Sequence, residues 1–165
     1  MSIEHRSDAP QAGFTLIEML AVITILSIVM AMAAPSFATF SSNQRLRSAA
    51  TDLVTTLLAA RSEAIKRNTQ VTVSAAAAGN GTNWGRGWTA IAPGGQQVDR
   101  KEVVAGAIDG STAPASIVFD GTGRITTAGG VSIQLNDGRG DAMVSPRCVS
   151  IDLSGRPQAS VGTCS

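Results

Sequence analysis

The longest apolar run in the chain, from Phe14 to Ala34, limits what the sequence can fold into more than any other feature. Its 21 residues would form about 31 Å of α-helix, which is enough to cross the hydrocarbon core of a membrane. The run contains one charged residue, Glu18. A carboxylate there is costly, by up to about 3 kcal/mol at the bilayer centre and less near an end, so we expect Glu18 to have a function.

A small residue, Gly13, stands before this run, after the polar stretch MSIEHRSDAPQAG. A secretory signal peptide has a shorter apolar region, and its small-residue cleavage site follows that region. Here the small residue comes first, so cleavage would remove residues 1–13 as a leader and retain the apolar helix. Because basic and acidic residues balance in the leader, the charge distribution says little about orientation.

The segment GFTLIE, Gly13 to Glu18, resembles the prepilin signature of type IV pilins and type II secretion pseudopilins. The resemblance implies that a prepilin peptidase cuts between Gly13 and Phe14 and that the new amino group of Phe14 is methylated. Glu18 then becomes the fifth mature residue and Pro35 the twenty-second, both positions characteristic of the family. It also implies a single-pass protein of the bacterial inner membrane, with its C-terminal domain in the periplasm, that enters a pilus or pseudopilus.

The resemblance gives Glu18 a role in assembly. Cleavage would create an amine at Phe14, about one helical turn from Glu18, both on the same chain and on neighbouring chains. Packing of subunits could then neutralise the carboxylate, so its membrane cost would favour assembly. The alternative is an inert carboxylate that reaches back to the membrane interface.

Apolar residues continue at three- and four-residue spacing beyond Pro35, which predicts an amphipathic helix over residues 35–67. Pro35 should kink or loosen this helix rather than end it. We expect the apolar stripe to face a folded domain. Contacts with partner subunits are expected instead from the transmembrane helix, residues 14–34, where alanines allow close approach of helices.

Residues 68–165 change to short apolar segments punctuated by glycine, which predicts strands at QVTVSAA, GWTAIA, EVVAGA, ASIVF, VSIQL and CVSIDL. The fold class is therefore α+β: a long N-terminal helix, transmembrane in its first half and amphipathic in its second, packed on an antiparallel sheet. The segments ARSEAIKRNTQVTVS and NWGRGW and two Gly-Arg turns make this β-rich domain similar to the GspH/FimT branch of the pilin-like proteins.

Two segments of this domain look alike, VFDGTGRIT and SIDLSGRPQ, and we interpret both as hairpin tips. If Cys148 and Cys164 faced each other across the second hairpin, the midpoint would be Arg156, inside the turn. The same register would pair Ile151 with Val161 and Leu153 with Ala159. We therefore predict a Cys148–Cys164 disulfide, with two free buried thiols as the alternative.

Nucleic-acid binding is the alternative function. Some FimT-like minor pilins bind DNA during natural transformation through a C-terminal Gly-Arg-any-Arg motif. This chain has Gly155-Arg156-Pro157-Gln158 and so keeps only the first arginine. The candidate phosphate contacts are Arg156, Arg124 and Arg147. Because residues 68–165 carry seven basic and seven acidic side chains, any binding should be weak and sensitive to salt.

Metal binding and catalysis have little support. The segment LNDGRGDAM gathers Asn136, Asp137 and Asp141 as a calcium loop might, but the spacing matches no calcium motif, so we interpret it as a polar surface turn. The only histidine, His5, lies in the leader, which excludes most histidine-based sites from the mature chain. We expect no cofactor, no metal and no enzymatic activity.

The resemblance implies a minor pilin or pseudopilin, at or near the filament tip, that helps to initiate or cap assembly. Its partners would be other major and minor pilins or pseudopilins, the prepilin peptidase and lipid of the inner membrane. The sequence leaves open whether it serves a type IV pilus or a type II secretion system. The cysteine-closed C-terminal hairpin and the two Gly-Arg turns favour the pilus.

Overall fold

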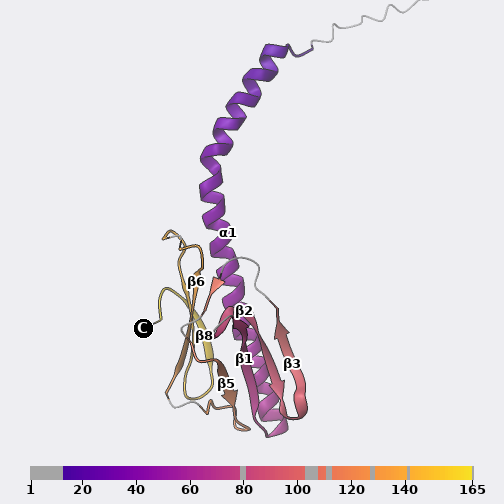
Figure 1. Ribbon diagram of the computed structural model, residues 1–165, viewed down its shortest axis with the longest axis vertical. Helices are drawn as coiled ribbons and strands as arrows, with labels where there is room; N and C mark the ends of the chain where they lie inside the picture. The colour runs from indigo at the N-terminus through magenta and orange to yellow at the C-terminus, as the bar shows by residue number, and fades with distance from the viewer. Residues whose placement is uncertain are drawn as a thin grey trace, which may run out of the picture. The chain divides into compact units, whose positions relative to one another are not determined.

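The structure, a computed structural model, describes residues 13–78, 81–102, 108–110, 113–126, 129–140 and 142–164 (Figure 1). One long helix, α1 (Leu16–Arg67), precedes all the strands. The strands are β1 (Val71–Ala78), β2 (Gly81–Ala92), β3 (Gln96–Lys101), β4 (Ile108–Asp109), β5 (Ser116–Phe119), β6 (Val131–Asp137), β7 (Arg147–Ile151) and β8 (Pro157–Val161), with a short 3-10 turn, η1 (Pro93–Gly95), between β2 and β3. The chain divides into two compact units, the first ending at Phe37 and the second beginning at Ala38.

The first unit contains the N-terminal part of α1. This helix is long and apolar enough to cross a membrane: an 18-residue window has a mean hydropathy of 2.4, and none of that window is buried. Pro35 lies within α1, which continues beyond it to Arg67, as the periodicity of the sequence predicts. The proline is thus tolerated inside a helix.

The helix ends where the sequence indicates. Lys66 and Arg67 lie in its last turn, where positive charge complements the helix dipole. Asn68 follows with a φ of 48°, a left-handed conformation that asparagine adopts more readily than most residues. The backbone N–H of Thr69 then donates to the carbonyl of Ala64 at 3.1 Å. The last turn is therefore closed by its own backbone before β1 begins.

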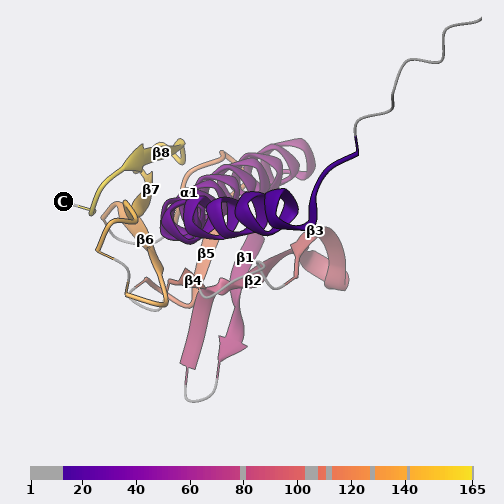
Figure 2. The same cartoon turned by 90° about the horizontal axis from the view of Figure 1, so that it is seen from above.

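The second unit contains two antiparallel four-stranded sheets, with strand orders β3-β2-β1-β5 and β4-β6-β7-β8. Seen from above, β6, β7 and β8 lie to one side of the helix and β3 to the other (Figure 2). The α+β class is confirmed, but the expectation of one sheet is wrong. Alternation of apolar residues predicts which face of a strand is buried, whereas it does not say which strands pair.

The core of the second unit lies between α1 and the two sheets. The stripe predicted from spacing is buried: Leu46, Leu53 and Leu57 are at most 1% exposed. The sheets contribute the other large side chains of the core, which are Val71, Val73, Trp84, Trp88, Ile117, Phe119, Ile133, Leu135 and Ile151. The predicted strand EVVAGA falls mostly outside the described residues, and β3, with the sequence QQVDRK, was not expected.

Candidate assembly and interaction sites

The N-terminal end of α1 is closed by a reciprocal pair of hydrogen bonds between Thr15 and Glu18. The backbone N–H of Glu18 donates to Thr15 Oγ1 at 3.3 Å, and the backbone N–H of Thr15 donates to Glu18 Oε2 at 3.3 Å. This is the capping box, in which residues three apart satisfy N–H groups that the helix itself leaves free. Glu18 therefore caps the helix in addition to carrying a charge.

Sequence reasoning missed this function of Glu18, although the signal was present. A threonine followed three residues later by glutamate, at the start of an apolar run, is the sequence signature of a capping box. The carboxylate is also in the first turn, where the helix dipole favours negative charge. The expected role of Glu18 in assembly, and that of Pro35, stay predictions.

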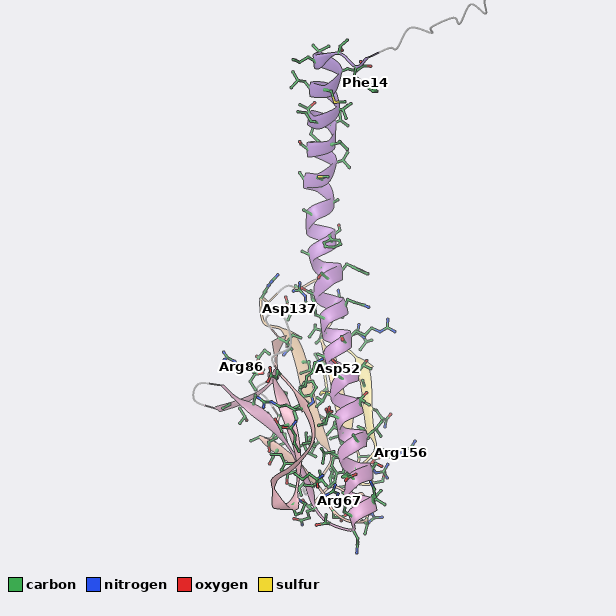
Figure 3. All side chains as sticks on the ribbon, turned by 90° about the vertical axis from the view of Figure 1, so that its right-hand side faces the viewer. Phe14, Asp52, Arg67, Arg86, Asp137 and Arg156 are labelled. Carbon is green, nitrogen blue, oxygen red and sulfur yellow. A yellow bond between two sulfur atoms is a disulfide. The ribbon has the colours of Figure 1, made fainter. Side chains whose placement is uncertain are left out.

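The apolar side chains of the first unit form an exposed surface around α1. Their exposed fractions range from 45% to 78%. Those side chains belong to Phe14, Leu16, Ile17, Met19, Leu20, Val22, Ile23, Ile25, Leu26, Ile28, Val29, Met30, Met32 and Phe37. An apolar surface of this extent has to be covered by lipid or by other helices. In Figure 3, Phe14 marks the end at which this surface begins.

The two look-alike segments form matching turns. In the first turn, Asp120 Oδ1 accepts from the backbone N–H groups of Thr122 and Arg124 at 2.8 and 3.0 Å, and from Thr122 Oγ1 at 2.6 Å. The backbone N–H of Gly123 donates to the carbonyl of Asp120 at 2.9 Å. The aspartate thus organises the turn and leaves Arg124 exposed at its exit.

The second turn repeats this geometry. Asp152 Oδ1 accepts from Ser154 Oγ at 2.6 Å and from the backbone N–H of Arg156 at 3.0 Å. The backbone N–H of Gly155 donates to the carbonyl of Asp152 at 2.9 Å. Gly123 and Gly155 have nearly equal φ angles, 78° and 76°. The interpretation as hairpin-like tips with an exposed arginine at the exit is confirmed for both.

The two turns pack against each other and against α1. The Nε of Arg61 in α1 donates to the carbonyl of Gly123 at 3.0 Å, and its Nη2 donates to the carbonyl of Ser154 at 3.2 Å. A Cβ on Gly155 would lie 3.4 Å from the Cα of Arg124. The turn that presents Arg124 therefore lies beside the turn that presents Arg156, and we call these two turns with Arg61 the paired-turn cluster.

The same hydrogen bonds affect the acidity of both aspartates. The Thr122 hydroxyl, followed by the backbone N–H of Arg124, lowers the pKa of Asp120 below its ordinary value of 3.8. The Ser154 hydroxyl, followed by the backbone N–H of Arg156, lowers the pKa of Asp152 in the same way. Each turn is therefore stabilised by an ionised aspartate at neutral pH.

Arg147, the third candidate phosphate contact, does not belong to this cluster. It begins β7, whereas Arg156 follows the turn at the other end of that strand, about 13 Å of strand away. Its side chain is half-buried, and its Nε is buried without a hydrogen-bond partner among the described residues. Spacing along the sequence could not separate Arg147 from the other two arginines.

The disulfide between Cys148 and Cys164 is present, with a Cα–Cα distance of 5.2 Å. The predicted register, however, is wrong. Cys148 pairs with Ser160, Val149 with Ala159 and Ile151 with Pro157. Gly162, with a φ of 109°, lets the chain turn after β8, so that Cys164 reaches Cys148 from beyond the ladder. The disulfide therefore fastens the C-terminal tail rather than the hairpin itself.

The segment NWGRGW forms a wide bulge in β2. Ala75 of β1 pairs with Trp88, and the next residue, Ala76, pairs with Asn83, so residues 84–87 have no partner in that ladder. Trp84 and Trp88 are buried, and their Nε1 groups donate to the carbonyl of Pro114 at 2.9 Å and to Thr56 Oγ1 at 3.0 Å. The two tryptophans therefore anchor the bulge in the core.

Between the tryptophans, Arg86 is exposed and is flanked by two glycines. Any other residue at either glycine position would force the neighbouring backbone to move. A Cβ on Gly85 would lie 2.0 Å from the carbonyl oxygen of Ile108, and one on Gly87 would lie 2.3 Å from that of Lys101. Arg86 and Arg156 lie at different sides of the domain in Figure 3. Arg86 is thus separate from Arg156 and is not part of the paired-turn cluster.

Of the three candidate ligands in the predicted polar turn, Asn136 and Asp137 end β6, and Asp141 lies outside the described residues. Asn136 Oδ1 accepts from Gln134 Nε2 at 2.9 Å. Among the residues that the structure describes, no group of three or more His, Cys, Asp and Glu side chains is placed to hold a metal ion.

Comparisons with known proteins give consistent results. The family model described as Type II transport protein GspH matches residues 49–155, and the model described as Prokaryotic N-terminal methylation motif matches residues 8–34. A comparison with curated protein sequences found no match.

Among solved structures, the type IV minor pilin FimU of Pseudomonas aeruginosa is similar in two crystal forms. The first has 21% sequence identity and a TM-score of 0.57, and the match covers 73% of this chain and 92% of FimU. The second has 20% identity and a TM-score of 0.54, and the match covers 69% and 91%. At these identities the likeness concerns the fold.

Proposed function

The chain belongs to the GspH family of minor pilins and pseudopilins, and from this membership we propose that it helps to initiate or cap assembly of a pilus or pseudopilus. The family consists of structural subunits rather than enzymes. The match to the methylation motif over residues 8–34 and the apolar start of α1 within it are typical of a membrane-anchored, pilin-like protein.

The observation that carries this proposal is the exposed apolar surface from Phe14 to Phe37 at the N-terminal end of α1, most of which lies within the matched methylation motif. Before assembly this surface would lie in lipid of the inner membrane. After assembly it would contact the helices of other major and minor pilins or pseudopilins, and the alanines among its residues would allow close approach.

One further feature supports the periplasm as the location of the second unit. The Cys148–Cys164 disulfide forms and persists in an oxidising compartment such as the periplasm. The prepilin peptidase would cut after Gly13, and the mature chain would begin with a methylated Phe14.

The proposal is tested by processing and by incorporation. Gly13→Leu should leave the precursor uncut and absent from the sheared filament fraction, whereas Gln11→Leu, two residues earlier in the leader, should be processed normally. Immunoblots of membranes and of sheared filaments measure both results. Normal processing and incorporation of Gly13→Leu would contradict the proposal.

The choice between the two machines can be decided in a deletion strain. We favour the type IV pilus, as the Gly-Arg turns and the C-terminal disulfide led us to expect. Deletion should then reduce surface pili while leaving extracellular enzymes at their normal level. Loss of secreted enzymes with normal piliation would assign the chain to type II secretion.

Binding of DNA is a second candidate, and the paired-turn cluster favours it. The sequence keeps only one arginine of the Gly-Arg-any-Arg motif, but the first turn brings Arg124 next to the turn of Arg156. Two exposed guanidinium groups could therefore contact neighbouring phosphates. A function in DNA uptake would follow from such binding.

A gel-shift assay at low salt tests this candidate. Arg124→Ala with Arg156→Ala should abolish a shift that the wild-type protein gives, and Arg139→Ala, in the exposed turn after β6, should not. Binding should weaken steeply with salt, since each phosphate contact releases counterions. Absence of any shift at low salt would end this hypothesis.

A further inference from the structure

A pocket of about 160 Å³ lies between α1 and the β7–β8 hairpin in the second unit, outside the paired-turn cluster. Its wall on the helix contains Arg47, Ala50 and Thr51, and the other wall contains Arg147 and the end of β8, including Val161. Arg47, Thr51 and Val161 are exposed and Ala50 is buried, so the pocket opens to the surface and has its base against the helix.

The position of Arg147 in the wall of this pocket follows from strand register. Arg147 pairs with Leu135 of β6 on one side and with Val161 of β8 on the other. Residues that pair directly across an antiparallel ladder share a face of the sheet. Leu135 is completely buried in the core, so the side chain of Arg147 is also on the face toward α1.

The pocket holds positive charge that forms no ion pair within the described part of the chain. Arg147 Nε is buried and has no hydrogen-bond acceptor, and neither Arg147 nor Arg47 has a carboxylate within ion-pair distance among the described residues. None of the described residues that line the pocket is acidic. Buried donors of native proteins are nearly always satisfied, so the buried, unsatisfied Nε of an arginine that lines a pocket indicates a missing acceptor.

We propose that this pocket binds the carboxylate of an aspartate or glutamate from a neighbouring filament subunit. A carboxylate matches the planar fork of a guanidinium and accepts two of its N–H groups at once. The identity of the donor rests on the proposed function, because it requires that other subunits pack beside this chain.

The rim of the pocket favours a protein segment over a free anion. Val161 is 66% exposed beside the two arginines, and Ala159 and Ser160 next to it are exposed as well. In the described topology β8 pairs only with β7, so it forms the edge of its sheet. An open strand edge with an exposed valine next to a positively charged pocket is suited to a protein surface that carries an acidic side chain.

The first experiment tests the pocket alone, using the full chain in detergent micelles and acetate as the probe. The NMR signal of the Arg147 Nε–Hε group, identified by its loss in Arg147→Lys, should shift saturably with acetate and not with chloride at equal ionic strength. The signal of Arg156 serves as an internal control and should stay in place. No saturable shift of Arg147 would overturn the proposal.

Two variants and a second anion sharpen this test. Arg47→Gln should weaken acetate binding several-fold, while Arg45→Gln, on the same helix but outside the pocket lining, should leave it unchanged. Equal binding in Arg47→Gln and Arg45→Gln would overturn the pocket as described. If inorganic phosphate binds about tenfold more tightly than acetate, the site is assigned to a phosphate group, and the proposal of a carboxylate ligand is overturned.

The second experiment tests the neighbouring subunit in assembled filaments. A photo-crosslinking amino acid at Val161 should join this chain to an acidic peptide of another pilin subunit, and Arg47→Gln but not Arg45→Gln should reduce the yield. An unchanged yield in Arg47→Gln, or a crosslinked peptide without Asp or Glu, would overturn the proposal. If the chain is absent from filaments, both the proposed function and the assignment of the carboxylate to a neighbouring subunit are overturned. The acetate titration would still show whether the pocket binds a carboxylate.

Discussion

Gly155 lies so close to Gly123 that a Cβ added to Gly155 would stand 2.0 Å from the carbonyl oxygen of Gly123. The two residues are far apart in sequence and occupy equivalent positions in the two look-alike turns. Their contact is what makes the turns one structural unit. A side chain at Gly155 would have to push the first turn away from the second.

Gly155→Ala should therefore destabilise the second unit more than a glycine substitution of equal backbone strain. Gly129 provides the control, because its φ of 86° is also left-handed but a Cβ there would meet nothing within 4 Å. Gly129→Ala should cost about 1 kcal/mol from backbone strain alone. Gly155→Ala should cost about 1–3 kcal/mol more from overpacking. Chemical denaturation measures both, and equal losses would contradict the close contact.

Arg61→Ala should loosen both turns together. It removes two hydrogen bonds to carbonyl groups, Gly123 O and Ser154 O, from a charged donor. We expect a loss of about 1–3 kcal/mol of unfolding free energy. Hydrogen exchange should become faster at the amides of both Gly123 and Gly155. Arg139→Ala is the matched control and should change the exchange rate of neither amide. Faster exchange in only one turn after Arg61→Ala would refute the idea that Arg61 holds both turns.

The stability of the second unit should fall at acidic pH in a way that depends on Asp120 and Asp152. Both carboxyl groups have a pKa lowered in the folded protein by hydrogen bonds from Thr122 and Ser154 respectively. Their contribution is present above the unfolded-state pKa, about 3.9, and is lost as the pH falls through the folded-state values. Replacing both by Asn should flatten the stability profile below about pH 4. Denaturation curves at several pH values test this, and parallel profiles would contradict it.

Glu18 caps α1 and is expected to act in assembly, and substitution can separate the cap from the charge. Glu18→Gln keeps a side chain that can complete the capping box with Thr15 but removes the charge, while Glu18→Ala removes both. If neutralisation of the charge drives assembly, as the resemblance to prepilins leads us to expect, both variants should lower the amount of chain in sheared filaments. Normal incorporation of Glu18→Gln together with loss in Glu18→Ala would show that the cap is what matters.

Much of the helix could be predicted from the sequence because its signals are local. The apolar periodicity around Leu46, Leu53 and Leu57 and the basic last turn each concern residues within a few positions of one another. The hairpin-like turns were predictable for the same reason, since an aspartate and a glycine at fixed spacing define each of them.

Features that depend on distant pairing were not predictable. The disulfide was predicted correctly from a wrong register, because the sequence does not show that Gly162 turns the chain before Cys164. Arg61 binds carbonyl groups 62 and 93 residues away in the sequence. Arg147 lines a pocket with residues of α1. No local sequence pattern encodes which of these distant segments lie together. The division into two sheets was missed for the same reason.

The bulge in β2 has a practical consequence. Gly85 and Gly87 are fixed by backbone carbonyls beside them, and Trp84 and Trp88 are fixed by the core, so variation in this segment is confined to the residue between them. Position 86 can thus accept side chains of different charge and polarity without any rearrangement of the core. The same freedom makes it a suitable point to attach a fluorophore and follow the subunit in living cells.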